Sequence, residues 1–293
     1  MYIRIDKTIM EQFPKKTYDE FVMNFFEYPD EPIKIPSIEE MVSALKTSPD
    51  NYYITYCAYC KTPGLLQAPK KRNPKEDPSP CGMCGEIDPI YKLFSTLNKV
   101  KLFCDISNEI KNLHPDNCAW LMHSRDIERI LFGQCVISIA TGCEIFFKEV
   151  YCVFMNEIFV RPDKDLYDYF KKRVENRFVN YGKISDDYKD ALGIDLKKII
   201  NSNNSDVLYL MFQIRHILVH NNGIIDKKFI ENNKNIKILK ERGLSYSKGD
   251  RYIISIDDLK EFEMNLMKLI TNIQSEYHKI FLNVAIERYN QHP

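Results

Sequence analysis

The feature that most constrains the fold of this chain is a long amphipathic pattern between Asp126 and Phe159. Its apolar residues recur at the spacing of one helical face: Ile127, Ile130, Leu131, Val136, Ile139, Ile145, Phe146, Val150, Val153 and Phe154. Such spacing predicts an α-helix with one face in a hydrophobic core. Arg161-Pro162 ends the pattern, because proline does not continue a helix.

Several other segments have helical periodicity or helix-capping residues. They predict helices over residues 16–26, 37–46, 88–113, 164–179, 186–200, 203–220 and from about 257 to 288, with an irregular or hairpin-like stretch over 223–256. We therefore expect a mainly α protein with two domains. Residues 118–293 are predicted to form a helical bundle, and residues 1–117 a smaller α+β domain.

Composition excludes several classes of protein. The 293 residues are 44% apolar and 28% charged, as in globular proteins, which argues against a disordered chain. Lys and Arg total 41, as do Asp and Glu, so the net charge of zero argues against non-specific nucleic-acid binding but not against a local basic groove. No apolar run reaches the ~18 residues of a membrane span, and the first residues, with Asp6 and Glu11, lack a signal-peptide core. We expect a cytoplasmic protein with no membrane partner.

Four of the nine cysteines form two CxxC pairs, Cys57-x2-Cys60 and Cys81-x2-Cys84, within residues 52–86. Each pair can close a tight turn that aims two thiolates at one ion, and this spacing is typical of tetrahedral zinc. The segment resembles a zinc ribbon, which implies a structural Zn²⁺ in the N-terminal domain. A catalytic zinc is the alternative, but four thiolates leave no open coordination position for a substrate or water.

The loop between the two pairs is basic and rich in proline. Its cations, Lys61, Lys70, Lys71, Arg72 and Lys75, outnumber Glu76 and Asp77. Such a loop can contact nucleic-acid phosphates, dock a protein partner, or be no more than solvated. The other five cysteines lie in apolar surroundings, and we expect them to be buried thiols and not disulfides.

Two histidines and an arginine end another apolar-periodic run, Arg215-His216-Ile217-Leu218-Val219-His220-Asn221-Asn222-Gly223. Imidazole titrates near neutral pH and guanidinium is a permanent cation, so together they can move protons and hold a phosphate. His216 and His220 share one helix face, whereas Arg215 and His220 are about 140° apart around an ideal helix. Either the helix ends or distorts before His220, or the site combines two chains.

Other interpretations of these residues remain open. Arg215 and His220 can be cations at the negative end of a helix dipole, or members of a satisfied core network. His216 and His220 have the spacing of a metal-binding pair, with Asp226 as the nearby third ligand. Glu144 lies among aromatic residues of the long pattern, where it is expected either to pair with a cation of another helix or to face a cleft.

The segment from Arg215 to His220 resembles the R-x4–6-H motif of HEPN domains, in which a polar residue, here His216, follows the arginine. The resemblance extends to Asn222-Gly223, to Asp226, and to Lys248-Gly249-Asp250-Arg251-Tyr252-Ile253 ahead of the last helix. Gly142-Cys143-Glu144-Ile145-Phe146-Phe147 is similar to part of the first long HEPN helix. The resemblance covers about residues 120–290.

The resemblance implies an all-helical HEPN-like bundle that dimerises and places two such motifs across one cleft. Many members of the family are metal-independent ribonucleases of defence or toxin systems. On that basis His220 would move the proton of the 2′-hydroxyl or of the leaving oxygen, and Arg215 would stabilise the charge of the transition state. His216 would orient the phosphate or the motif of the partner copy. Some members have an acidic residue on the first long helix, which would make Glu144 part of the site.

We therefore expect a homodimeric, metal-independent endoribonuclease of the abortive-infection or toxin type that cleaves RNA. Structural zinc would be its cofactor, and the N-terminal domain would engage a protein partner or regulator. The alternative is a non-catalytic HEPN-like module that binds RNA or protein, with the zinc ribbon as a docking domain. The sequence has no glycine-rich phosphate loop, G-x-S-x-G or H-E-x-x-H motif, which argues against ATP and nicotinamide chemistry.

Overall fold

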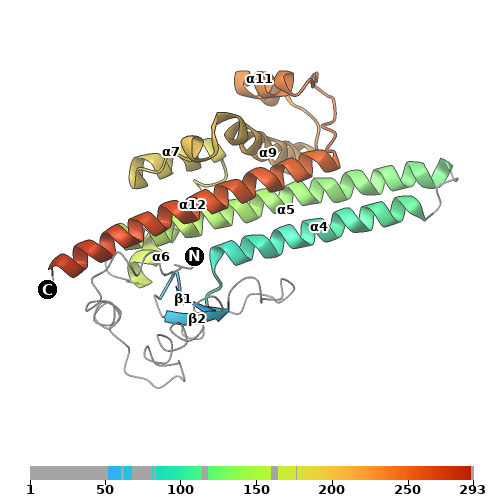
Figure 1. Cartoon of the computed structure of the whole chain (residues 1–293). Coiled ribbons are helices and arrows are strands. Elements are labelled where there is room, and N and C mark those ends of the chain that lie inside the picture. The colour runs from blue at the N-terminus through green and yellow to red at the C-terminus, as the bar shows by residue number, and fades with distance from the viewer. Residues whose placement is uncertain are drawn as a thin grey trace. The chain divides into compact units, whose positions relative to one another are not determined.

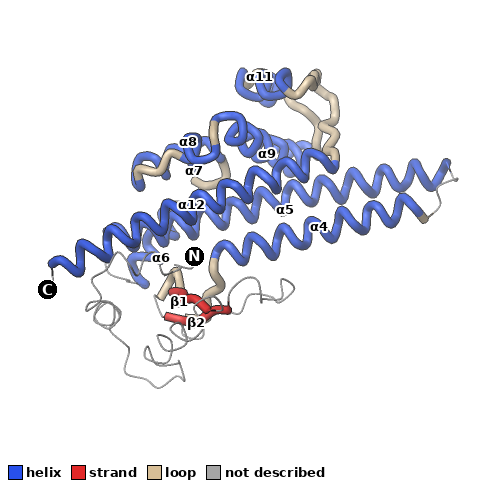
Figure 2. The backbone as a smooth tube through the Cα atoms, in the orientation of Figure 1, coloured by secondary structure: helices blue, strands red, loops and turns tan. Residues whose placement is uncertain are grey.

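A computed structural model describes residues 52–60, 63–67, 81, 84–113, 118–159, 164–175 and 177–291 of the chain. Within these residues the protein is mainly helical, as the sequence predicts (Figures 1 and 2). The helices predicted over residues 16–26 and 37–46 lie outside the described residues, as does most of the basic loop between the two cysteine pairs.

The elements follow one another in a simple order. The two strands are β1 (Tyr52–Tyr56) and β2 (Pro63–Gln67). The described helices are α4 (Pro89–Asn112), α5 (Cys118–Phe159), α6 (Lys164–Arg173), α7 (Tyr181–Leu192), α8 (Leu196–Ile200), α9 (Ser202–Asn221), α10 (Lys227–Ile230), α11 (Asn233–Glu241) and α12 (Ile256–Gln291).

The chain divides into two compact units, each assembled from separate segments. The helical unit consists of Lys92–Tyr151 and Lys171–Ile273. The cysteine unit consists of the described residues of Met1–Tyr91, Cys152–Phe170 and Gln274–Pro293. The Arg215–His220 segment belongs to the first unit and the CxxC pairs belong to the second.

Helix α5 is the long helix that the amphipathic pattern predicts, and it begins earlier, at Cys118. Its buried side chains in the helical unit recur at helical spacing: Phe132, Cys135, Val136, Ile139, Ala140, Cys143, Phe146, Phe147 and Val150. Two apolar residues of that pattern, Ile130 and Ile145, are exposed and not part of the core. Helix α4 lies along α5 within this unit (Figure 1). The ammonium of Lys92 is 2.8 Å from the buried carboxylate of Glu149, and a Cβ on Gly142 would lie 3.1 Å from Leu93.

The segment Met122–Asn156 of α5 also has the length and composition of a membrane span, with a mean hydropathy of 1.8. Half of that apolar window is buried inside the protein. A core helix of a protein outside any membrane meets the same criteria, so this property is weak evidence for a span. Among the described residues no other helix has it.

Helix α7 packs on α5 through aromatic side chains. The hydroxyl of Tyr188 donates a hydrogen bond of 2.6 Å to the carbonyl of Phe147, and their rings meet edge to face at 5.9 Å. The Tyr188 ring also lies 5.7 Å from that of Tyr151 and 6.2 Å from that of Phe178. Edge-to-face pairs of this kind stabilise a core beyond the area they bury.

Three stretches differ from the predicted helices. The helix predicted over 164–179 is shorter, because α6 ends at Arg173. The helix predicted over 186–200 is divided into α7 and α8, because Gly193 adopts a left-handed conformation (φ 69°) and Asp195 caps the start of α8. The stretch predicted to be irregular, 223–256, contains α10 and α11, whose first turns are capped by Asp226 and Asn232.

In the cysteine unit, β1 and β2 pair antiparallel with Tyr52 opposite Gln67. The residues that follow β1 turn directly into the first cysteine pair, and Ala58 within this turn is buried. The ring of Tyr59 meets Tyr167 of α6 edge to face at 5.4 Å. The cysteine turn is therefore packed against helical residues of its own unit.

Candidate functional site

Helix α9 carries the Arg215–His220 segment as regular helix up to Asn221. Asn222 then adopts a left-handed conformation (φ 51°), and the amide of Gly223 donates a 2.9 Å hydrogen bond to the carbonyl of Ile217. A left-handed residue followed by an amide that bonds back to a carbonyl of the last turns terminates the helix. The helix therefore neither ends nor distorts before His220, which excludes one of the two explanations for the offset between Arg215 and His220.

The apolar face of α9 fixes which of its side chains reach solvent. Leu210, Met211, Ile214 and Ile217 are buried, each at 1% exposure or less, whereas His216, Val219 and His220 are exposed. The two imidazole rings lie on the same face with centroids 4.6 Å apart. Two adjacent, exposed histidines can hold one anionic group between them.

Arg215 leaves α9 near the edge of its buried face and meets Glu144 of α5. The guanidinium Nη2 is 3.4 Å from the carboxylate Oε2, and the two side chains are 24% and 20% exposed. Among the described residues, neither Arg215 Nε nor Glu144 Oε2 has a hydrogen-bond partner, although both atoms are buried. Glu144 thus pairs with a cation of another helix, one of its two predicted placements, but the contact is an ion pair that leaves hydrogen-bonding capacity unused.

On this continuous helix, Arg215 and His220 point in directions about 140° apart. The arginine lies against α5 and the histidine faces solvent on the other side. One chain therefore brings Arg215 together with Glu144 and His216 together with His220, but α9 does not itself aim the guanidinium and the His220 imidazole at one point.

The surroundings of His216 favour its neutral form. Partial burial lowers the pKa of His216 below 6.5, and the positive charges of His220, Lys228 and Arg215 lower this pKa further, while Asp226 opposes them. A neutral imidazole has a nitrogen that can accept a proton or a hydrogen bond. His216 can therefore serve as an acceptor near neutral pH.

The carboxylate of Asp226 is hydrogen-bonded to neighbouring residues of the chain. Its carboxylate accepts hydrogen bonds of 2.8 Å from the side-chain amide of Asn221 and from the backbone amide of Phe229. These bonds lower the pKa of Asp226, the amide of Phe229 contributing most. Within the described residues Asp226 does not join His216 and His220 in a metal-binding group.

Two cations near the end of α9, Arg251 and Lys228, were not predicted as site residues from the sequence. The Nη1 of Arg251 donates a 2.7 Å hydrogen bond to the carbonyl of Asn222. Lys228, in the short helix α10, contributes to the low pKa of His216. The spacing of these residues in the sequence carries no signal of their proximity, because a chain reversal between Gly223 and Arg251 brings them together.

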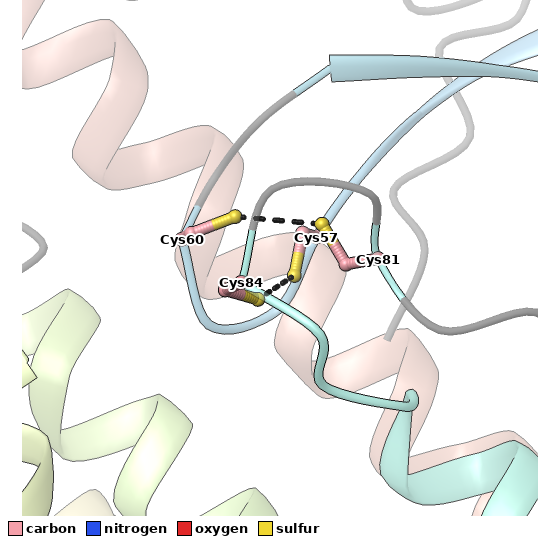
Figure 3. Close-up of side chains that lie close together, drawn as sticks. All are labelled: Cys57, Cys60, Cys81 and Cys84. Atoms are coloured by element: carbon pink, nitrogen blue, oxygen red, sulfur yellow. Dashed lines mark hydrogen bonds between the residues drawn. The ribbon is translucent and has the colours of Figure 1, made fainter. Parts of the chain in front are cut away.

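The four cysteines of the CxxC pairs converge in the cysteine unit (Figure 3). Cys57 Sγ lies 3.6 Å from Cys84 Sγ, and Cys60 Sγ lies 3.6 Å from Cys81 Sγ. All four sulfurs lie within 4.8 Å of one another. Sulfurs in tetrahedral contact with zinc, with Zn–S bonds of about 2.3 Å, would be about 3.8 Å apart, so this cluster has the dimensions of a metal site.

Local turns aim these sulfurs. After the second pair, Gly85 is left-handed (φ 73°), its amide bonds to the carbonyl of Cys81 at 2.8 Å, and the amide of Cys81 bonds to the carbonyl of Glu86 at 2.9 Å. The side chain of Cys60 and burial raise the pKa of Cys57, and burial raises the pKa of Cys84 to about 11. A bound cation would reverse this preference for the thiol, because a metal-coordinated thiol is deprotonated.

Among the remaining cysteines whose burial is described, Cys135, Cys143 and Cys152 are buried and reduced, as predicted, whereas Cys104 is reduced but only half-buried. Burial raises the pKa of Cys135 to about 12. These thiols therefore behave as small apolar side chains.

Two groups of residues can thus carry chemistry, each within one unit of the protein. They are the Arg215, His216, His220 and Glu144 set of the helical unit and the four-cysteine cluster. No family model matches the chain, and comparison with characterised proteins and with solved structures found no match.

Proposed function

We propose that the protein is a metal-independent endoribonuclease whose active site uses Arg215 and His220. The observation that carries the proposal is the arrangement at the end of α9, where two exposed imidazoles 4.6 Å apart follow a partly buried arginine. The resemblance of this segment to the R-x4–6-H motif of HEPN domains supports the same function.

The chemistry needs a base, an acid and a cation. His220 removes the proton of the 2′-hydroxyl or protonates the leaving oxygen, and the neutral His216 accepts a hydrogen bond that orients the substrate. The guanidinium of Arg215 stabilises the charge that develops on the phosphate oxygens in the transition state. The 2′-hydroxyl is the nucleophile, so the substrate is RNA and the product carries a 2′,3′-cyclic phosphate.

The proposed active unit is a homodimer, in which Arg215 of one copy acts with His220 of the other. The uninterrupted helix supports this, since one copy of α9 points the two side chains in different directions. Arg215 Nε and Glu144 Oε2 are buried and lack hydrogen-bond partners among the described residues, so the contact between the two side chains does not use all of their hydrogen-bonding capacity. Glu144 is then a positioning residue that holds the guanidinium.

The test compares the purified wild type with Arg215→Ala and His220→Ala on total RNA in the presence of EDTA. The wild type should release fragments with cyclic phosphate ends, and both variants should lose this activity. His123→Ala, which removes another exposed histidine of the helical unit, is the matched control and should cut as the wild type does. Equal cleavage by the wild type and the His220 variant, or no cleavage by the wild type, would refute the proposal.

A second function, a non-catalytic module that binds RNA or protein, is favoured by the Arg215–Glu144 ion pair. A carboxylate 3.4 Å from the guanidinium neutralises it, as in a purely structural pair. In that case Arg215→Ala would lower stability but leave any RNA binding unchanged. The same cleavage assay separates the two functions.

We further propose that the four cysteines hold one structural Zn²⁺ in a ribbon-like N-terminal domain that engages a protein partner or regulator. The sulfur spacing and the two local turns support zinc, and four thiolate ligands would leave no position for catalysis. Elemental analysis should give about one zinc per chain. Cys57→Ser should lose this zinc, whereas the control Cys104→Ser, outside the cluster, should keep it; a wild type without metal would refute the zinc assignment.

A further inference from the structure

We propose that Lys228 and Arg251, together with His216 and His220, form a surface that binds the phosphate backbone of RNA beside the proposed cleavage site. We call the two cations the basic rim. This inference rests on the proposed function in taking RNA as the ligand, and it adds substrate-binding residues that the Arg215–His220 motif does not contain.

Backbone hydrogen bonds place Arg251 at the end of α9. The amide of Ile225 donates to the carbonyl of Asp250 at 2.8 Å, and the amide of Tyr252 donates to the carbonyl of Gly223 at 2.9 Å. An antiparallel bridge between Ile224 and Arg251 lies between these bonds. The residues that follow α9 and the residues around Arg251 therefore run side by side.

The guanidinium of Arg251 then lies against the last turn of α9. Its Nη1 donates to the carbonyl of Asn222 at 2.7 Å, and its side chain passes 3.9 Å from the point where a Cβ on Gly223 would lie. A cation at this position also complements the negative end of the helix dipole. A guanidinium has five N–H donors, so one bond to a carbonyl leaves the others for a phosphate.

Lys228 lies two residues after Asp226, whose carboxylate accepts a hydrogen bond from the side chain of Asn221, the last residue of α9. It lies in the first turn of α10, which Asp226 caps, and its positive charge lowers the pKa of His216. The neighbouring carboxylates are bonded locally: Asp226 accepts from Asn221 and Phe229, and Asp250, next to Arg251, accepts from the backbone amide of Ser247. Through the bond between Asp226 and Asn221, the turn that contains Lys228 is joined to the end of α9 that carries the exposed histidines.

Several other cations of this segment are neutralised by carboxylates. The pairs are Lys227 with Glu231 at 3.5 Å, Lys234 with Asp206 at 2.8 Å, Lys237 with Glu241 at 3.7 Å, and Arg242 with Asp258 and Glu261 at 2.5 Å. Among the described residues, Lys228 and Arg251 have no such partner. Arg215, by contrast, is paired with Glu144. In one copy of the chain, the two cations of the basic rim therefore form no ion pair with the described residues, and Arg251 lies against the last turn of the helix that carries the two histidines.

The test measures binding of a fluorescently labelled 2′-O-methyl RNA oligonucleotide to the full chain by anisotropy at several salt concentrations. This probe lacks the 2′-hydroxyl nucleophile, so it cannot be cleaved by the proposed chemistry. Arg251→Gln removes the charge but keeps an amide that can donate to the Asn222 carbonyl, and Lys228→Gln removes the charge in α10. Lys183→Gln, an exposed lysine on α7, is the charge-matched control.

Each rim variant should bind more weakly and lower the slope of log K against log salt by about 0.7, the contribution of one phosphate contact on a single strand. Arg251→Lys should restore the slope, and Lys183→Gln should bind as the wild type does. A wild type that does not bind, or rim variants with unchanged slopes, would overturn the inference.

The outcome is independent of whether the chain cuts RNA. If the wild type cleaves RNA while both rim variants bind normally, the basic rim is refuted and the ribonuclease proposal stands. If the rim variants lose binding while the wild type cuts nothing, the rim is supported and the ribonuclease proposal fails. Should Arg251→Gln not fold, Lys228→Gln and Arg251→Lys still decide the matter.

Discussion

The contact between Arg215 and Glu144 allows a quantitative test of how the proposed catalytic arginine is held. We consider Glu144→Gln, Arg215→Gln and the double variant, which replace the ion pair by amides of similar shape. Because Nη2 and Oε2 are 3.4 Å apart, the Coulomb attraction between unit charges at an effective dielectric constant of about 20 is about 5 kcal/mol. The net effect on stability is smaller, since both charges lose hydration on burial.

The net contribution of this ion pair to the free energy of unfolding depends on how exposed its two side chains are. Exposed ion pairs contribute up to about 1 kcal/mol, and removing one member of a fully buried pair costs about 3–5 kcal/mol. The side chains here are 24% and 20% exposed, which is closer to the buried case. We expect each single variant to lose about 2 kcal/mol, and the double variant to lose about 1–2 kcal/mol less than the sum of the two.

Urea unfolding of the four proteins measures this coupling energy. The control is the same cycle on Arg129 and Asp126, an ion pair at 3.3 Å whose side chains are 47% and 63% exposed, where we expect a coupling below about 1 kcal/mol. If the Arg215–Glu144 cycle is additive within about 0.5 kcal/mol, then Glu144 does not hold Arg215, and its role as a positioning residue is refuted.

Two further predictions concern the backbone and the pH response of the helical unit. Gly193→Ala places a Cβ in a left-handed conformation (φ 69°) and should lower the free energy of unfolding by about 1 kcal/mol, which thermal or urea unfolding will detect. The pKa of His216 is lowered below 6.5, mainly by burial, so between that folded pKa and 6.5 the unfolded chain binds the additional proton. Stability should therefore fall as the pH decreases through this window, and His216→Gln should reduce the fall; an imidazole titration at or above 6.5 in NMR spectra would contradict this.

The sequence predicts the long helices well because their periodicity is strong and their ends are marked. Helices α5, α9 and α12 all coincide with apolar patterns at helical spacing. The division between α7 and α8 was not predicted, because an isolated glycine such as Gly193 is tolerated within a helical pattern. Helices α10 and α11 were missed because they are short and rich in lysine and asparagine, although Asp226 and Asn232 are recognisable N-caps.

Some features of the candidate sites could be predicted from residue spacing in the sequence, whereas others depend on how distant segments pack together. The CxxC spacing was enough to predict that the four cysteines converge, although the 3.6 Å contacts join Cys57 with Cys84 and Cys60 with Cys81, across the two pairs. The pairing of Arg215 with Glu144 depends on how α9 packs on α5, and no local pattern encodes that contact. Arg251 reaches the end of α9 through hydrogen bonds between separate segments, so its position also required the fold.

The uninterrupted course of α9 leads to a last prediction, which separates a one-chain site from a two-chain site. If Arg215 of one copy acts with His220 of its partner, a dimer of one Arg215→Ala chain and one His220→Ala chain contains one site with both residues intact. When equal amounts of the two inactive variants reassociate at random, half of the dimers are mixed, and each mixed dimer has one intact site and one site that lacks both residues. The mixture should therefore recover about a quarter of the wild-type cleavage. If both residues act within one chain, the mixture should remain inactive, because every copy lacks one of them. Recovery in the mixture would show that dimerisation supplies what the direction of the two side chains on one helix does not.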